Sequence, residues 1–553
     1  MKQKEKRMLT TDSAIRRHAY GLPLAFVLGF IYRVVMGLQG VDTVDVGFCN
    51  TFYQVIFPHP DSNSFNFLYY LTGLLGGLWE RQLGQFGLVG FRILEAACLS
   101  AAVYLLYKTF RHAIRPRMML AAVSLSFLFP TIIVTFHYDT LSYLLIAASA
   151  YAYGRAMRTA KRQWLLAAGV MIGLSFFARI VNLTLMALAL VPLIGLGRGK
   201  GPRFDVRSAI WFLSGIVAAA LLMLCLMLVL HQMPYYLQAL DMAFGTLADN
   251  QATHSQGNLF FKYFKGVINV ALLMVAVAAL AWGYDRWSGI EKRRHLVVTI
   301  VLGVVFLVTT YTSLPYTMAL SLSLVLCFGL FRRISDGVVR ATVVYLLMAA
   351  LLFPFGSDIG IAGVYNWCAG LTIFPAVYCA QQLGRKWCGP LVWAYTSIAL
   401  CAVLKLGLKA YGSSTPRYRD TVLVQKGRLN VRVDPASAIR YQDVIGAIVD
   451  HRGDNRLLLL LNQKSEIYYA TGMLPFLGHT QTVIYIGRRL DERLDERKAH
   501  FGRTPLVVYI KGIEEMRETA EVCTVVFEWM KRNRYVIAYE DRYCTVYRSA
   551  DEQ

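Results

Sequence analysis

Blocks of uninterrupted apolar sequence, each roughly 15 to 24 residues long, recur from the beginning of this chain to about residue 410. A helix rises about 1.5 Å per residue, so a block of about 20 residues crosses the roughly 30 Å of hydrocarbon in a bilayer. Charged residues make up only 16% of the chain and hydrophobic residues 56%, whereas a soluble domain carries about 25% charged residues. The sequence therefore predicts a polytopic α-helical membrane protein.

We predict about thirteen spans from these blocks. They cover residues 20–37, 87–107, 118–136, 139–156, 163–178, 180–196, 208–231, 263–283, 296–312, 314–331, 340–355, 364–382 and 389–410. The apolar segment 65–79 contains Gly73, Gly76 and Gly77, and we expect it to lie as a helix at the membrane surface.

The chain has a net charge of +23, and its basic residues are distributed as the predicted topology requires. Arginine and lysine gather at the N-terminus and in every second loop, as in RHAIRPR (111–117) and DRWSGIEKRR (285–294). Such a bias marks the cytoplasmic face, so the N-terminus is predicted to be cytoplasmic and membrane lipids to be the partners of these charges. Nucleic-acid binding is not expected.

From about Gly412 the composition becomes polar, with nearly balanced charges. We therefore predict two domains, a transmembrane domain over 1–411 and a soluble α/β domain over 412–553. An odd number of spans would place the second domain outside the cytoplasm. Its expected strands are RLLLLLN, TVIYIG, PLVVYIKG, YVIAYED and CTVYRS, with helices starting near Tyr441, Leu490 and Ile513.

This alternation predicts a mostly parallel sheet covered on both faces and closed by a hairpin through Asp541 and Arg542. No phosphate-binding glycine motif follows any of the strands, so nucleotide binding is not indicated. Cys523 and Cys544 could form a disulfide outside the cytoplasm or remain buried thiols.

The first outer loop, GVDTVDVGFCNTFYQVIFPHPDSNSFN, carries the acids Asp42 and Asp45 and, further on, His59. A carboxylate that faces hydrocarbon is costly, by about 2.5 to 3.5 kcal/mol at mid-membrane, so we expect these acids to face a wet cavity. The alternative is that they are ordinary solvated loop residues.

The second outer turn, FHYDTLSY, contains His137, Tyr138 and Asp139 with almost no loop around them. Asp139 can serve as an N-cap that accepts from the amide of Ser142 or its neighbour, and a cap can also belong to a site.

Arg179 is the only cation in the otherwise apolar outer turn SFFARIVNL. It could hold phosphate through its planar fork or extend to lipid headgroups. The next outer segment, 231–262, is predicted to be a long loop of the kind that forms lids, and it ends at Lys262. Asp358 lies in a glycine-flanked turn, where it could simply form the turn.

A basic N-terminus, one span, a long first loop with an acid pair, an acid at the second outer turn and a C-terminal α/β domain together resemble the GT-C superfamily of polyprenyl-phosphate-sugar glycosyltransferases. Bacterial protein O-mannosyltransferases and lipid A aminoarabinose transferases belong to it. The resemblance is best over the first seven spans. It implies a multi-pass protein of the bacterial inner membrane with its C-terminal domain in the periplasm.

The resemblance also implies roles for the polar residues. The first-loop acid, Asp45 or Asp42, would be the general base, and Asp139 would orient the acceptor or the base. Arg179 and Lys262 are the candidates for holding the lipid phosphate. Some relatives use a divalent cation such as Mg²⁺ or Mn²⁺, for which Asp45 and Asp139 would supply oxygens. The remaining candidates, for substrate binding, are His59, His137, Tyr138 and Asp358.

The chemistry expected of these residues is sugar transfer from a polyprenyl-phosphate donor to a hydroxyl of a glycan, lipid or protein acceptor, with inversion. The base removes the hydroxyl proton, and cations stabilise the departing phosphate. The main alternative is a transporter or lipid flippase. It requires acids near the middle of spans, and we expect none there. A receptor whose C-terminal domain binds a partner is a third class.

Overall fold

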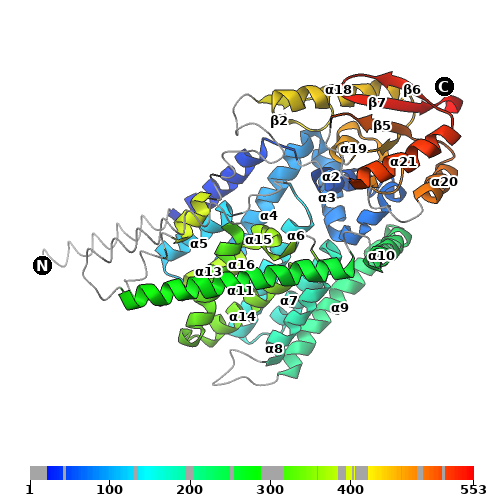
Figure 1. Ribbon diagram of the computed structural model, residues 1–553. Coiled ribbons are helices and arrows are strands. Elements are labelled where there is room, and N and C mark those ends of the chain that lie inside the picture. Colours follow the sequence, from blue (N-terminus) through cyan, green and yellow to red (C-terminus); the bar gives the residue numbers. More distant parts are fainter. Residues whose placement is uncertain are drawn as a thin grey trace, which may run out of the picture.

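The computed structural model describes residues 21–41, 45–129, 135–194, 205–248, 255–287, 315–357, 359–383, 391, 394–401, 404, 421–462, 464–482, 490–512 and 517–552. In Figure 1, a large body of helices carries a smaller region with strands, coloured yellow to red, at one end. This confirms a mostly helical protein with apolar helices and a C-terminal α/β region. The expected domain boundary at 411/412 lies outside the described residues.

The first helix, Gly21–Gly37, is followed by α2 (Asp45–Val55), which is short and almost wholly buried. The helical body then contains η1 (Pro60–Tyr69), α3 (Tyr70–Leu83), η2 (Gly84–Phe86), α4 (Gly87–Phe110), α5 (Pro116–Leu128), α6 (Tyr138–Thr159), α7 (Gln163–Ala178), η3 (Ile180–Ala189), α8 (Leu190–Ile194), α9 (Val206–Val229), α10 (Met233–Ala248), α11 (Gln256–Trp287), α13 (Pro315–Leu330), η4 (Phe331–Arg333), α14 (Gly337–Leu352), α15 (Gly360–Cys368) and α16 (Gly370–Ala380).

Four stretches of helix among the described residues are long and apolar enough to cross a membrane: Pro60–Phe110, Val206–Val229, Gln256–Tyr284 and Tyr316–Arg333. Six apolar helices are shorter, at 10–17 residues. The number of spans thus stays a prediction. The block 296–312 and most of 389–410 lie outside the described residues.

Two predicted segments differ from expectation. The expected long loop 231–262 is largely helical, because α10 fills most of its first half and α11 starts at Gln256. Apolar residues in MPYYLQALDMAF recur at helical spacing, a pattern hidden by the polar residues between them. The predicted span 180–196 is instead the 3-10 helix η3 followed by the single turn α8.

Small residues let α7 and α9 pack closely. A Cβ atom at Gly169 would overlap the carbonyl oxygen of Phe212, and one at Gly215 would overlap that of Leu166. Glycine at helix contacts of membrane proteins permits such backbone approach. This contact fixes α7, whose C-terminal end carries Arg179.

An acid does lie within a span, contrary to expectation. Glu95 is near the middle of α4 and is 1% exposed. Its carboxylate accepts a hydrogen bond of 2.7 Å from Arg33 of the first helix, which is also fully buried. A buried acid paired with arginine can join two helices without taking part in transport, but the expected absence of such acids no longer counts against a transporter.

The C-terminal region contains a five-stranded sheet in the order β4-β3-β5-β7-β6 and a separate pair, β1-β2. Its elements are β1 (Val422–Val424), β2 (Val431–Val433), α18 (Pro435–His451), β3 (Leu457–Leu460), α19 (Glu466–Thr471), β4 (Leu474–Pro475), α20 (Leu490–Phe501), β5 (Leu506–Ile510), α21 (Arg517–Arg532), β6 (Tyr535–Glu540) and β7 (Cys544–Ser549). β3 pairs in parallel with β4 and β5, whereas β7 is antiparallel to both its neighbours.

Alternate residues of the central strands enter two separate cores. Leu458 and Val508 pack in the core that contains α18, and Leu459 and Val507 pack with residues of α20 and α21. The sheet is therefore covered on both faces, as predicted. It is mixed rather than mostly parallel, because β7 runs antiparallel between β5 and β6, and the pair β1-β2 was not expected. Most of the predicted strand TVIYIG lies outside the described residues. Cys523 and Cys544 are both buried, in different cores, and no disulfide joins them.

The predicted closing hairpin is formed by β6 and β7. Asp541 accepts hydrogen bonds from the backbone N–H groups of Tyr543 and Cys544, at 2.8 and 2.7 Å. Partial burial alone would raise the pKa of Asp541, but these hydrogen bonds outweigh it and hold the pKa below its ordinary value of 3.8. The ionised carboxylate therefore stabilises the turn.

The C-terminal region is docked on the first outer loop. The N–H of Gly40 donates to the carbonyl of Arg432 at 2.8 Å, and the N–H of Arg432 donates to Leu38 at 3.0 Å, which extends β2 by one bridge. Next to it, α19 packs on α2, and Figure 1 shows α2, α3 and α19 close together. The loop that carries Asp45 is thus held by both regions.

Candidate functional site

The centre of the candidate site is a buried ion pair between Asp139 and Arg179. A guanidinium nitrogen of Arg179 lies 3.0 Å from a carboxylate oxygen of Asp139, and the two side chains are 6% and 4% exposed. α6 begins at Tyr138 and its N-cap residue is His137, so Asp139 lies inside the first turn and the expected N-cap position was wrong.

Arg179 follows the last residue of α7 in extended conformation, and this turns its side chain inward. Its guanidinium donates to the carbonyl oxygen of Phe353 at 3.2 Å and lies over the rings of Tyr138 and Phe353, at 5.7 and 5.3 Å. Because the side chain is buried, it does not extend to the headgroups. The described contacts place its charge next to a carboxylate.

His137 continues this polar cluster. Its Nδ1 lies 2.8 Å from the hydroxyl of Thr140, and its Nε2 lies 3.8 Å from the carboxylate of Asp139. The ring is buried against Trp367 of α15, with ring centres 5.2 Å apart. The second outer turn thus lies inside the protein, and its polar groups contact one another.

Asp45 is the first residue of α2 and is half-buried. Tyr69 and Tyr138 stack on each other with ring centres 4.3 Å apart. Phe48 of α2 contacts Tyr69, with ring centres 5.7 Å apart, and Asp45 lies one helical turn before Phe48 on the same side of α2. The guanidinium of Arg179 lies over the ring of Tyr138. The two outer segments therefore meet at this aromatic pair.

Other candidates are not part of this cluster. His59 lies beyond the opposite end of α2, a helix whose 11 residues span about 15 Å at 1.5 Å per residue. Lys262 has an exposed side chain on α11. Its neighbour Tyr263 donates to the carbonyl of Leu351 at 2.8 Å, close in sequence to Phe353. Asp42 and Asp358 lie outside the described residues.

Several aromatic residues of the site were missed by the sequence analysis. Tyr69 is at the start of the segment assigned to a surface helix, and Trp367 lies in a predicted span. His479 comes from the C-terminal region and packs against Phe48 and Phe65, with ring centres 5.3 and 4.7 Å apart. Spacing in the sequence carried no signal for this last contact, because it joins residues more than 400 positions apart.

The described residues do not fit a metal centre by themselves. No group of three or more histidine, cysteine, aspartate or glutamate side chains in the described part of the chain could hold an ion. One carboxylate oxygen of Asp139 is also 3.0 Å from Arg179, a cation that competes with a metal for it. We therefore derive no catalytic step from a metal.

Comparison with known families supports the sugar-transfer chemistry. Residues 81–231 match the family model described as dolichyl-phosphate-mannose-protein mannosyltransferase. The match agrees with the expectation of a membrane glycosyltransferase that uses a polyprenyl-phosphate sugar, and it covers both Asp139 and Arg179. Asp45 lies before the matched segment. No curated protein matches the chain.

Solved structures of ArnT and of an archaeal oligosaccharyltransferase align with nearly the whole chain at 11% identity. ArnT from Cupriavidus metallidurans bound to undecaprenyl phosphate has a TM-score of 0.41, with 96% of this chain and 97% of that chain covered. Its apo state has a TM-score of 0.44, with 97% and 98% covered. The archaeal oligosaccharyltransferase AglB from Archaeoglobus fulgidus, in complex with an inhibitory peptide and a dolichol-phosphate, has a TM-score of 0.44, with 97% and 75% covered. Because these superpositions are loose, we base the functional proposal on the family match and the site.

Proposed function

We propose that this protein is an integral-membrane glycosyltransferase that moves a sugar from a polyprenyl-phosphate donor to an acceptor hydroxyl. The observation that carries the proposal is the meeting of α2, which begins at Asp45, and the Asp139–Arg179 pair at the stacked rings of Tyr69 and Tyr138. The family match over the segment that contains Asp139 and Arg179 supports the same chemistry.

Asp45 is the proposed general base. It is half-buried at the start of α2, in the first outer loop, one helical turn before Phe48, which contacts Tyr69. Its carboxylate takes the proton from the acceptor hydroxyl as the oxygen attacks the anomeric carbon. The bond from that carbon to the phosphate oxygen breaks, and its electron pair leaves with the polyprenyl phosphate. A single displacement of this kind inverts the anomeric carbon. Asp42 is the alternative base.

Asp139 and Arg179 have linked roles in this proposal. The guanidinium has five N–H donors, and the described contacts use only part of them, so it can also face a phosphate oxygen of the donor. Asp139 fixes the orientation of that guanidinium. Lys262, at the outer part of α11, is proposed as a second cation for the phosphate. His137 and Tyr138 line the same site, whereas His59 and Asp358 are more peripheral proposals.

The stacked tyrosines give the site a surface for a sugar ring. Aromatic faces bind the C–H side of sugars, and Tyr69 also contacts Phe48 with ring centres 5.7 Å apart. Phe48 belongs to α2, which begins at Asp45, and Arg179 lies over the ring of Tyr138. We propose that a sugar bound at this aromatic pair is within reach of both Asp45 and Arg179.

The membrane orientation also belongs to the proposal. Because the first outer loop and the C-terminal region share a bridge at Gln39 and Arg432, both must lie on one side of the membrane. This supports an odd number of spans between the N-terminus and the C-terminal domain. With the N-terminus cytoplasmic, transfer takes place on the periplasmic face of a bacterial inner membrane.

The test is transfer of labelled sugar from a panel of polyprenyl-phosphate donors in membranes with matched protein levels. We expect Asp45→Asn to lose at least a hundredfold in rate, in line with the usual contribution of a general base. Asp61→Asn is the control, since Asp61 belongs to the same loop but contacts His500 of the C-terminal region at 3.2 Å. Asp42→Asn tests the alternative base.

The transferase proposal fails if no donor in the panel gives transfer, or if Asp45→Asn and Asp42→Asn both match wild type. The transporter alternative then gains weight, and its residues to test are Arg33 and Glu95. Their ion pair is the one described contact that joins charged groups near the middle of membrane helices.

A further inference from the structure

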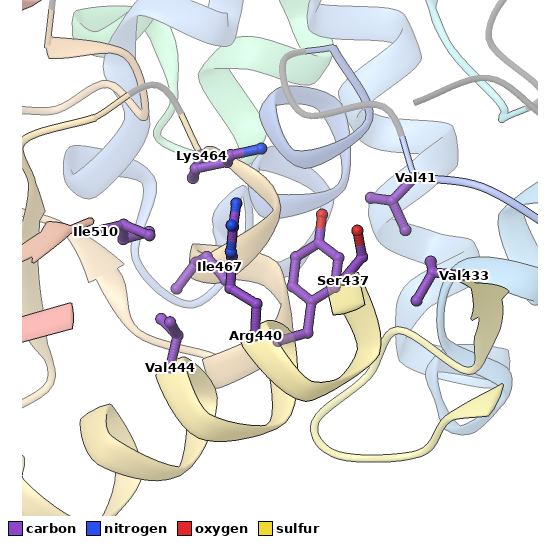
Figure 2. Close-up of a pocket in the computed structure, with 9 residues that line it drawn as sticks. Val41, Val433, Ser437, Arg440, Val444, Lys464, Ile467 and Ile510 are labelled. Atoms are coloured by element: carbon purple, nitrogen blue, oxygen red, sulfur yellow. The ribbon is translucent and has the colours of Figure 1, made fainter. Parts of the chain in front are cut away.

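A cavity lined by both polar and apolar side chains lies between the C-terminal region and the first outer loop. It is lined by Arg440, Lys464, Ser437 and Tyr441 together with the apolar side chains of Val41, Val433, Val444, Ile467 and Ile510. Figure 2 shows the side-chain ends of Arg440, Lys464 and Ser437 extending toward the same space. The sequence analysis and the proposed transfer mechanism use none of these residues.

Arg440 is incompletely satisfied in this cavity. Its Nε is buried and has no hydrogen-bond partner among the described residues. The guanidinium lies 5.9 Å from the centre of the Tyr543 ring. A buried donor without a partner is unfavourable, so a ligand that accepts a hydrogen bond from Nε is favoured.

The charged residues in the described lining of the cavity are both cations. Arg440 and Lys464 contribute two positive charges, and the buried carboxylate of Glu466 contributes one negative charge. Glu466 accepts a hydrogen bond of 2.9 Å from the hydroxyl of Tyr441, and the Lys464 amine is more distant, at 3.9 Å. One cation is therefore left over for an anionic ligand.

The size of the cavity limits that ligand. Its volume is about 60 Å³. A water needs roughly 10–15 Å³ by the same measure, so the cavity holds about four waters or a group of four to five heavy atoms. A tetrahedral phosphate has this size, and arginine, lysine and hydroxyl groups are its usual partners. A whole sugar does not fit.

We propose that this cavity binds a phosphate group, held by Arg440, Lys464 and Ser437. Its position indicates which phosphate. The carboxylate of Glu466 accepts a hydrogen bond from Tyr441, which lines the cavity. The backbone of Glu466 packs closely on Gly47, so that a Cβ atom added to Gly47 would overlap the backbone nitrogen of Glu466. Gly47 is two residues after Asp45. Given the proposed function, the phosphate belongs to the acceptor, whose hydroxyl must reach Asp45 from the side of the C-terminal region.

The first arm of the test measures binding without any transfer reaction. Inorganic phosphate is titrated into the purified full-length protein in nanodiscs of zwitterionic lipid, and saturable broadening of its ³¹P signal gives a dissociation constant. We expect Arg440→Gln and Lys464→Gln each to weaken binding about tenfold or more, and Arg440→Lys to weaken it less. Arg456→Gln is the matched control, because Arg456 is an exposed arginine of the same region.

The second arm separates two sources of phosphate. Nanodiscs with phosphatidic acid compete with inorganic phosphate if a lipid headgroup reaches the cavity, and do not compete if the phosphate comes from an acceptor outside the bilayer. In the transfer assay, phosphatase treatment of the acceptor fraction should lower wild-type transfer and remove the difference between wild type and Arg440→Gln.

Equal dissociation constants for wild type, Arg440→Gln and Lys464→Gln, or no saturable binding to wild type, overturn the phosphate site. Thermal unfolding of each variant confirms that it is folded. The two proposals can be refuted separately. If phosphate binding depends on Arg440 but no sugar is transferred, only the proposed function is refuted. If sugar is transferred but all variants bind phosphate equally, only the phosphate site is refuted.

Discussion

Removing either member of the Asp139–Arg179 pair should destabilise the protein far more than removing both. In Arg179→Met, the carboxylate of Asp139 remains buried without the guanidinium 3.0 Å away. In Asp139→Leu, the guanidinium remains buried and keeps its hydrogen bond to the carbonyl oxygen of Phe353. The double variant removes both charges and fills the space with apolar groups.

The magnitude follows from the burial of the pair. At 3.0 Å and an effective dielectric constant of about 20, the attraction between two unit charges is on the order of 5 kcal/mol, most of which offsets the cost of desolvation. Breaking a buried pair at one end typically costs about 3–5 kcal/mol, whereas replacing both ends is close to neutral. We therefore expect each single variant to lose about 3 kcal/mol and the double variant to lose about 1 kcal/mol.

The assay is unfolding of the purified protein in detergent, monitored by circular dichroism, with all four forms of the cycle measured. A coupling of several kcal/mol with a restored double variant supports the ion pair. Losses that simply add, or single variants within about 0.5 kcal/mol of wild type, would refute the reasoning. The double variant also separates stability from function, since we expect it to be folded and inactive in sugar transfer.

Three further predictions concern residues around the site and in the hairpin. Gly47→Ala should loosen the docking of the C-terminal region, because the added Cβ atom overlaps the backbone of Glu466, and limited proteolysis of that region should become faster. Gly283→Ala is the control, since no atom lies within 4 Å of the added Cβ. Tyr69→Ala should raise the KM for the donor about tenfold, while Tyr69→Phe keeps it within about twofold. Asp541→Ala should speed hydrogen exchange in β6 and β7 at neutral pH, and the difference from wild type should vanish as pH falls below 3.8, since the folded-state pKa is depressed and protonation removes the stabilisation.

Sequence patterns predicted the class of the protein because hydrophobic length and helical or strand spacing are local properties. The helices α4, α6, α7 and α9 and the final hairpin follow such patterns closely. The helix α10 was predicted as a loop because polar residues interrupt its apolar face. The acid Glu95 within a span was not expected, because the free-energy cost of burying its charge is offset by Arg33, a partner about sixty residues away.

The candidate site was predictable only as separate pieces. Asp45, Asp139 and Arg179 were identified one by one, as polar residues where apolar spans end. Their convergence depends on how α2, α6 and α7 pack, and Tyr69, which joins them, gave no local signal. The polar cavity at Arg440 combines α18, the segment before α19 and Val41, so no single stretch of sequence indicates it.

The first outer loop buries polar side chains as well as apolar ones. Asn50, Thr51, Asn63 and Asn66 in this loop are all completely buried. Such polar side chains would be out of place in hydrocarbon and would be exposed in an open loop, but here the C-terminal region covers them from outside. Asp45 itself is half-buried, and we expect this cover to limit the access of water to it, which would favour transfer of a sugar to an acceptor hydroxyl over transfer to water. A C-terminal region docked in this way is therefore part of the proposed catalytic site, and loosening it should raise hydrolysis of the donor relative to transfer.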